Sequence, residues 1–146
     1  MKASLVDWLS SLLGFKSRAL WSNELGDFHF VPQIGWVGKL PGSSIELVIG
    51  ADTPNYKDQG TLATVRELTE ELTGVLQNCI DFLTRNAVKW DVNPVIFKSM
   101  QIASVQILWP TEYPNYFRIE FVPDMEDRVW YVEIESFTPR ECGFDH

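Results

Sequence analysis

Residues 61–88 read TLATVRELTEELTGVLQNCIDFLTRNAV and lie between two groups of alternating segments. Apolar side chains recur in this stretch every three or four residues, as they do on one face of an α-helix. They are Leu62, Val65, Leu68, Leu72, Val75, Leu76, Cys79, Ile80 and Leu83. Gly74 weakens a helix by about 1 kcal/mol relative to alanine but need not end it. We therefore predict one continuous helix over residues 61–88, packed across one face of a sheet.

The segments on both sides of this helix alternate apolar and polar side chains, which is the period of a β-strand. They cover residues 27–31, 33–40 and 45–49 before the helix, and residues 101–109, 117–121 and 130–135 after it. Short segments of turn residues connect most of them. The predicted fold class is α+β: an antiparallel sheet formed by a three-stranded meander, a long helix and a second three-stranded meander, with the helix on one face.

Residues 1–18 are expected to form a separate short amphipathic helix. Apolar residues recur there at helical spacing, namely Leu5, Trp8, Leu9, Leu12 and Leu13. The apolar run is too short and too interrupted to cross a bilayer or to serve as a signal peptide. We expect this helix to fold against the core; the alternative is a helix that rests on an anionic membrane. The predicted organisation is thus a helix at residues 1–18 and a single α+β domain at residues 24–146.

The composition is that of one acidic domain. The chain has 146 residues, with 12 Lys and Arg against 20 Asp and Glu, which gives a formal net charge of −8. This balance argues against a nucleic-acid partner, because phosphate binding needs a basic surface. Acidic residues concentrate in residues 112–146, which we interpret as solvated loop and strand faces that keep the protein soluble; the alternative is an acidic patch for a basic partner. Cys79 and Cys142 are too few for a disulfide scaffold and fit a reducing, cytoplasmic compartment. No pattern decides the oligomeric state.

Motifs for catalysis and for cofactor binding are absent from the sequence. It contains no P-loop, dinucleotide fingerprint, nucleophile elbow or HExxH motif. The two cysteines form no CxxC pair, and neither His29 nor His146 lies near them in the sequence. We therefore expect no cofactor and no metal site.

Strand carboxylates are the one alternative with catalytic potential. Glu133 and Glu135 share a strand face, and Glu120 on a neighbouring strand could join them. Two carboxylates about 7 Å apart could support glycoside hydrolysis or bind a hard cation such as Ca²⁺. The competing interpretation is a solvated sheet face on which Arg118 and Arg128 act as counter-charges.

Aromatic residues are unusually frequent, and six of them are tryptophans. WPTEYPNY, residues 109–116, places three aromatic side chains in a loop between two predicted strands, where exposed Trp and Tyr are typical interface anchors. The alternative is that Trp109 and Tyr116 close the end of the core. Residues 52–58 form a second candidate contact loop around Tyr56, and residues 122–127 form an acidic hairpin connection. The predicted partner-binding residues are Trp109, Tyr113, Tyr116, Tyr56, Asp124, Glu126 and Asp127.

Five short segments occur in an order that matches a known type of domain. They are LGDF at 25–28, IGWVGKL at 34–40, IEL at 45–47, WYVEIE at 130–135 and GFD at 143–145, with the predicted helix between the third and the fourth. In this order they resemble a family of small bacterial domains of unknown function that share a Gly-Trp β-hairpin, a long helix and a terminal three-stranded meander. Such domains are similar in style to immunity proteins encoded beside bacterial toxins. The resemblance implies a cytosolic, acidic binding protein that neutralises a basic partner, and it supplies no catalytic residues.

The leading hypothesis is therefore a non-enzymatic, cytosolic, acidic module that binds another protein, with an immunity-type inhibitor as its most specific form. One alternative is a carboxylate-based hydrolase or metal-dependent enzyme that uses Glu120, Glu133 and Glu135. The other is a peripheral membrane protein held by residues 1–18.

Overall fold

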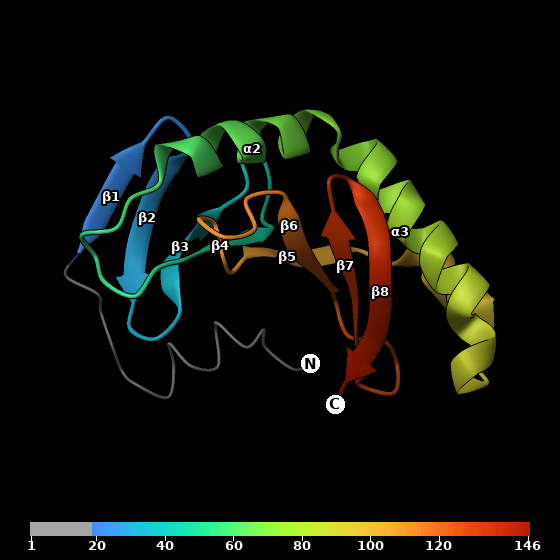
Figure 1. Ribbon diagram of the computed structural model, residues 1–146. Helices are drawn as coiled ribbons and strands as arrows, with labels where there is room; N and C mark the ends of the chain where they lie inside the picture. Colours follow the sequence, from blue (N-terminus) through green and yellow to red (C-terminus); the bar gives the residue numbers. More distant parts are fainter. Residues whose placement is uncertain (1–18) are drawn as a thin grey trace.

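A single sheet of eight strands runs through residues 19–146, which are the residues that the computed structural model describes (Figure 1). The order of the strands in the sheet is their order in the sequence. They are β1 (Leu20–Asn23), β2 (Gly26–Val31), β3 (Gly35–Lys39), β4 (Glu46–Gly50), β5 (Ile102–Ile107), β6 (Tyr116–Phe121), β7 (Val129–Glu135) and β8 (Thr138–Asp145). The helix predicted at residues 1–18 lies outside the described residues.

Neighbouring strands are antiparallel except at the centre of the sheet, where β4 and β5 are parallel and Leu47 lies opposite Val105. Parallel neighbours cannot be joined by a tight turn and need a crossover. Residues 51–101 supply it, and they contain the helices α2 (Gln59–Glu70) and α3 (Leu72–Asn86) and the short 3₁₀ helices η1 (Ala87–Trp90) and η2 (Pro94–Ser99).

The predicted fold class is therefore wrong. The sheet is mixed, and each half has four strands where a three-stranded meander was expected. Alternation does not reveal the two additional strands. β1 has only four residues, LWSN, and β8 reads TPRECGFD, in which a proline and a glycine interrupt the pattern. Both are edge strands, and each has a single neighbour within the described residues, β2 for β1 and β7 for β8.

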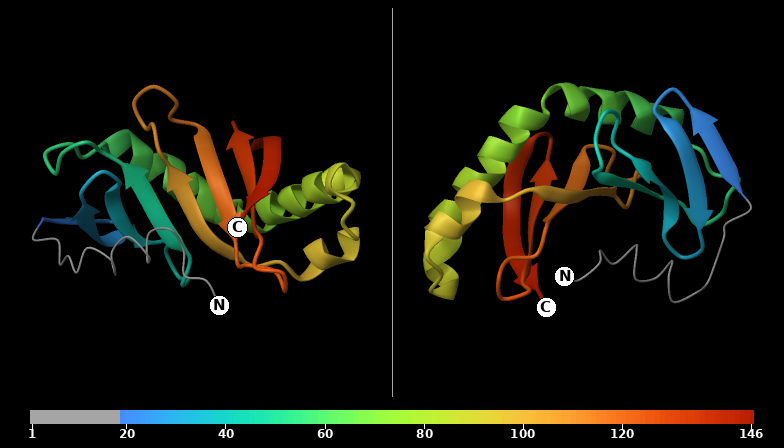
Figure 2. Two further views of the ribbon diagram at one scale, coloured as in Figure 1. Left: turned by 90° about the horizontal axis from the view of Figure 1, so that it is seen from below. Right: turned by 180° about the vertical axis from the view of Figure 1, so that it is seen from behind.

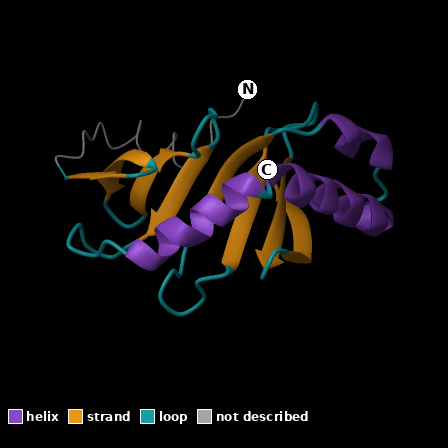
Figure 3. Ribbon diagram, turned by 90° about the horizontal axis from the view of Figure 1, so that it is seen from above, coloured by secondary structure: helices purple, strands orange, loops and turns teal. Residues whose placement is uncertain are grey.

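The helical stretch is also two helices rather than one. The break lies at Glu71, whose backbone leaves the helical region (φ −96°, ψ 7°), three residues before Gly74. Figures 1 and 3 show α2 lying across the sheet and α3 turning away from its line toward β8, against which it packs. The bend lets both helices keep their apolar faces on a sheet that twists. Within residues 19–146, no helix is long and apolar enough to cross a membrane.

The core lies between the helices and one face of the sheet. Strand residues from both halves meet there with Leu62, Val65, Leu68, Val75, Cys79 and Leu83 of the helices. The strand residues include Phe28, Trp36, Leu47, Ile49, Val105, Ile107, Phe117, Ile119, Trp130, Val132 and Ile134, all at most 1% exposed. Because the cluster is continuous from β1 to β8, residues 20–146 share one hydrophobic core.

Replacing Gly74 by alanine is expected to raise the free energy of unfolding by about 0.5–1 kcal/mol, because alanine loses less backbone entropy than glycine in a helix. A Cβ atom built at Gly74 meets no atom within 4 Å, so no steric cost opposes this gain. Thermal unfolding should show a midpoint about 2–4 °C above that of the wild type. A lower midpoint would show that the bend at Glu71 depends on the conformational freedom of Gly74.

Candidate functional site

Two loops meet at one edge of the sheet, the β4–α2 loop (residues 51–58) and the β5–β6 loop (residues 108–115). Each follows one strand of the central parallel pair, and the carboxyl ends of parallel strands lie at the same edge. The view from below in Figure 2 shows both loops projecting on that side of the molecule. The parallel order of β4 and β5 therefore brings together the two loops that the sequence predicts as contact loops.

Tyr56 joins the two loops. Its hydroxyl forms a hydrogen bond with the hydroxyl of Thr111, and its backbone carbonyl accepts a hydrogen bond from Trp36 Nε1 at 2.7 Å. Trp36 is 1% exposed and belongs to the core, so it connects the loop pair to the body of the protein. No sequence signal marks Thr111, because the bond spans 55 positions and depends on the strand order.

The β5–β6 loop presents an aromatic pocket, which we define by its lining residues Trp109, Glu112, Tyr113, Pro114, Asn115, Tyr116, Glu135 and Ser136. Its volume is about 420 Å³, within the range of small-ligand sites. The centroid of the Trp109 ring lies 6.4 Å from that of Tyr113 and 6.1 Å from that of Tyr116, and the two tyrosine rings are 6.5 Å apart. The three aromatic residues that the sequence singles out thus lie together around one cavity.

The exposure of these rings is unusual for this protein. Trp109 is 49% exposed and Tyr113 is 61% exposed, whereas Trp21, Trp36 and Trp130 are at most 4% exposed. Among the tryptophans of residues 19–146, Trp109 is the only exposed one. It therefore does not close the end of the core, which was the alternative interpretation.

Backbone hydrogen bonds hold the aromatic pocket in shape. The N–H of Tyr113 donates to the carbonyl of Trp109 at 2.8 Å, and the N–H of Tyr116 donates to the carbonyl of Tyr113 at 3.2 Å. The N–H of Ser136, in the β7–β8 turn, donates to the carbonyl of Asn115 at 2.9 Å. The backbone that carries the rings is therefore held before a ligand binds, so little backbone conformational entropy is lost on binding.

The rim of the aromatic pocket is negatively charged. Glu112 makes no ion pair with any residue in 19–146, and Glu135 makes one with Arg140, at 3.7 Å between two exposed side chains. The Tyr116 hydroxyl donates to Glu133. Burial raises the pKa of Tyr116, and the hydrogen bond to Glu133 and the negative charges of Glu133 and Glu141 raise it further.

The alternative carboxylate site is organised by a cation. Arg118 lies 3.2 Å from Glu120, 3.8 Å from Glu133 and 2.8 Å from Asp145. Its guanidinium carbon also lies 3.8 Å from the centre of the Tyr131 ring. This arrangement favours the interpretation that Arg118 is a counter-charge, because one guanidinium pairs with carboxylates from its own strand and from β7 and β8.

Glu135, the third member of that proposed site, pairs in register with Tyr116, two residues along β7 from Glu133, and lies at the aromatic pocket. Within residues 19–146, no group of three or more His, Cys, Asp and Glu side chains is arranged to hold a metal ion.

The three predicted acidic contact residues lie elsewhere. Asp124, Glu126 and Asp127 are in the β6–β7 connection, at the opposite end of β6 from the aromatic pocket. Asp124 is turned inward, and its carboxylate accepts four hydrogen bonds from the backbone and side chains of its own hairpin. Glu126 is 72% exposed and pairs with Arg128 at 3.1 Å. The predicted partner-binding residues thus form two separate groups, one aromatic and one acidic.

Comparison with known proteins gives no relative from which a role could be transferred. No family model matches the chain, and neither curated proteins nor solved structures show a match.

Proposed function

We propose that the protein is a cytoplasmic binding module for a basic protein partner, as an immunity-type inhibitor would be, and that the aromatic pocket is part of its contact surface. The observation that carries the proposal is the exposure of Trp109 and Tyr113 in a loop whose backbone is held by hydrogen bonds. Trp and Tyr are the residue types that most often dominate binding energy at protein interfaces. An exposed pair of them at a hydrogen-bonded site is consistent with an anchor point for a partner.

Charge supports a basic partner rather than an acidic one. The formal net charge is −8, and Glu112 and Glu135 lie directly at the aromatic pocket. Charge of one sign around a contact surface accelerates association with a partner of opposite sign, and added salt screens this effect. Cys79 and Cys142 are both free thiols, which is consistent with a reducing compartment.

Capture of the tagged protein from a lysate of its host, at low and at moderate salt, tests the proposal. We expect one stoichiometric basic partner, whose affinity falls as the salt concentration rises. The double variant Trp109→Ala/Tyr113→Ala should weaken binding of this partner by about 100-fold, since each anchor contributes about 1.4 kcal/mol or more.

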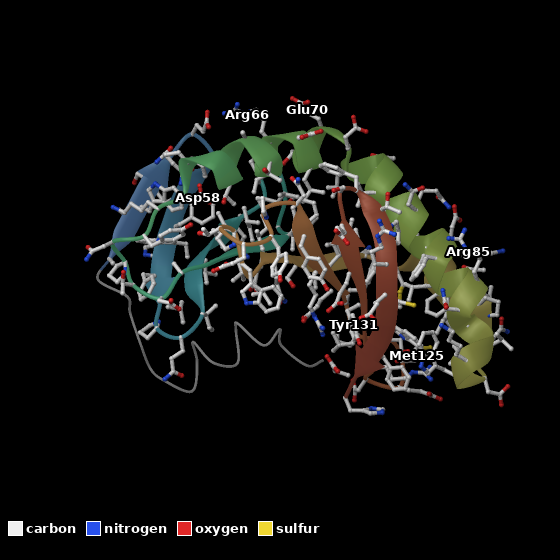
Figure 4. The ribbon with its side chains drawn as sticks, viewed as in Figure 1. Asp58, Arg66, Glu70, Arg85, Met125 and Tyr131 are labelled. Atoms are coloured by element: carbon white, nitrogen blue, oxygen red, sulfur yellow. The ribbon has the colours of Figure 1, made fainter. Side chains whose placement is uncertain are left out.

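Val88→Ala is the matched control. Val88 is an apolar side chain of η1 that is 84% exposed, and Figure 4 shows Arg85, three residues before it, well separated from Asp58 of the β4–α2 loop. This variant should bind the partner as the wild type does. A partner whose affinity is the same at both salt concentrations, or one that binds the double variant as tightly as the wild type, would contradict the proposal.

A further inference from the structure

We propose that the aromatic pocket receives the guanidinium group of an arginine side chain of the partner. The inference rests on the proposed function and deepens it, because it names the chemical group that the site recognises.

The rings provide faces on which a planar cation can stack. The planes of Trp109 and Tyr113 are nearly perpendicular, at 86°, and Tyr116 is inclined to them at 54° and 58°. The three rings therefore present surfaces in different directions around one cavity. Aromatic faces attract cations through the ring quadrupole, and guanidinium groups stack on them readily.

The carboxylates provide the second half of the recognition. Glu112 and Glu135 line the same cavity, and a guanidinium group can donate two parallel hydrogen bonds to a carboxylate. Glu135 already lies beside one guanidinium, that of Arg140, at 3.7 Å between exposed side chains. Exposed ion pairs of this kind are weak, so a stacked arginine can displace Arg140 from Glu135.

The same sheet already contains this combination of contacts. Arg118 stacks on the Tyr131 ring, at 3.8 Å from its centre, while it pairs with Glu120 and Glu133. A guanidinium held by a tyrosine face and two strand carboxylates is therefore a geometry that this sheet supports.

Other occupants fit less well. The lining of the aromatic pocket contains no Lys, Arg or His, and its two charged residues are Glu112 and Glu135, so it offers an anion no cationic group of its own. An uncharged apolar side chain could contact the rings, but it would desolvate Glu112 and Glu135 without compensation.

Titration with two short peptides tests the inference. The probes are Gly-Arg-Gly and Gly-citrulline-Gly amides, which have nearly the same shape but differ in side-chain charge. The signal is the indole N–H resonance of Trp109 in a ¹H–¹⁵N spectrum of the full chain. We expect the arginine peptide to shift it saturably and the citrulline peptide to bind about tenfold more weakly or not at all.

Three variants make the test specific. The double variant Glu112→Gln/Glu135→Gln should lower the affinity for the arginine peptide by about threefold to tenfold, because it removes the two charges and keeps the shape of the side chains. Arg140→Ala should raise this affinity by about twofold, because it frees Glu135 from its ion pair with Arg140. Val88→Ala should leave the titration unchanged.

Equal shifts by the two peptides, or no shift of the Trp109 resonance by the arginine peptide, would overturn the inference. A basic, salt-sensitive partner captured together with such a negative titration would leave the proposed function standing and reject the arginine site alone. Arginine binding at Trp109 without any captured partner would support the site chemistry and count against the proposed function.

Discussion

Replacing Asp124 by alanine is expected to lower the free energy of unfolding by about 3 kcal/mol or more. The Asp124 carboxylate accepts hydrogen bonds at 2.8 Å from Trp130 Nε1 and from Arg128 Nε, and it also accepts the backbone N–H groups of Glu126 and Arg128. Trp130 is fully buried, so its indole N–H would lose its partner where water cannot replace it. Arg128, which is only 16% exposed, would lose its partly buried ion pair with Asp124 and keep only the one with the exposed Glu126. The unsatisfied indole N–H carries the full cost of desolvation, and the lost Arg128–Asp124 pair adds to it.

Urea unfolding at pH 7 measures this effect, and Glu126→Ala is its control. Glu126 pairs with the same Arg128, but its side chain is 72% exposed, so its removal should cost less than about 1 kcal/mol. Similar losses for the two variants would mean that the inward position of Asp124 contributes nothing special to stability.

The pH dependence gives an independent check on Asp124. Burial by itself raises the pKa of Asp124, but the hydrogen bonds from Trp130, Arg128 and Glu126 outweigh it and hold this pKa below its ordinary value. A group with a lowered pKa in the folded state stabilises the protein at pH values above its unfolded pKa, which is about 3.9 for aspartate. That stability is lost as the pH falls through the folded pKa. The difference in the free energy of unfolding between the wild type and Asp124→Asn should therefore be largest at neutral pH and should shrink below about pH 4.

Replacing Gly35 by alanine is the other change with a large expected effect. Gly35 begins β3 with φ +129°, and a Cβ atom there would lie 2.3 Å from the carbonyl oxygen of Ile49 and 2.6 Å from the N of Ala51. Both contacts are to backbone, which cannot rotate away. The backbone strain costs about 1–3 kcal/mol, and the steric overlap costs about as much again. We expect a total loss of about 3–5 kcal/mol in the free energy of unfolding.

Gly26→Ala separates the two contributions. Gly26 has nearly the same φ, +124°, but a Cβ atom there meets no atom within 4 Å. This variant should lose only the stability that corresponds to backbone strain, so the midpoint of thermal unfolding should be much lower for Gly35→Ala than for Gly26→Ala. If Gly35→Ala does not fold at all while Gly26→Ala does, the order of the two variants is the same. Equal losses would show that β3 and β4 can move apart at little cost.

The alternating pattern predicted the positions of most strands. Six of the eight strands within residues 19–146 overlap segments that it marks, including β4 and β5, whose residues are almost all buried on both faces. The pattern carries no information on strand direction or neighbours. The parallel β4–β5 pair was missed for this reason. The break at Glu71 was missed because the apolar period of the sequence continues through it and only the shape of the sheet requires the bend.

The candidate site was predictable in its residue types but not in its assembly. Trp109, Tyr113 and Tyr116 lie within eight consecutive residues, so the sequence alone predicts that they are close together. Tyr56 reaches the same loop, at Thr111, only because the parallel strands β4 and β5 place both loops at the same end of the sheet. The sequence indicated Glu135 only as a possible catalytic carboxylate, because it lies on a strand face. Its position at the aromatic pocket is the reason that our proposal gives it a partner-binding role.

The central parallel pair also determines how the chain reaches this structure. β1–β4 and β5–β8 are each series of neighbouring antiparallel strands, so most of their contacts are local and can form early in folding. Leu47 and Val105 can pair only when residues 51–101 form the crossover between β4 and β5, and closing this long loop costs conformational entropy. We expect the docking of two preformed halves to limit the folding rate. Tyr56 follows one half and Thr111 belongs to the other, so their contact, beside the aromatic pocket in sequence, is completed only in that final step.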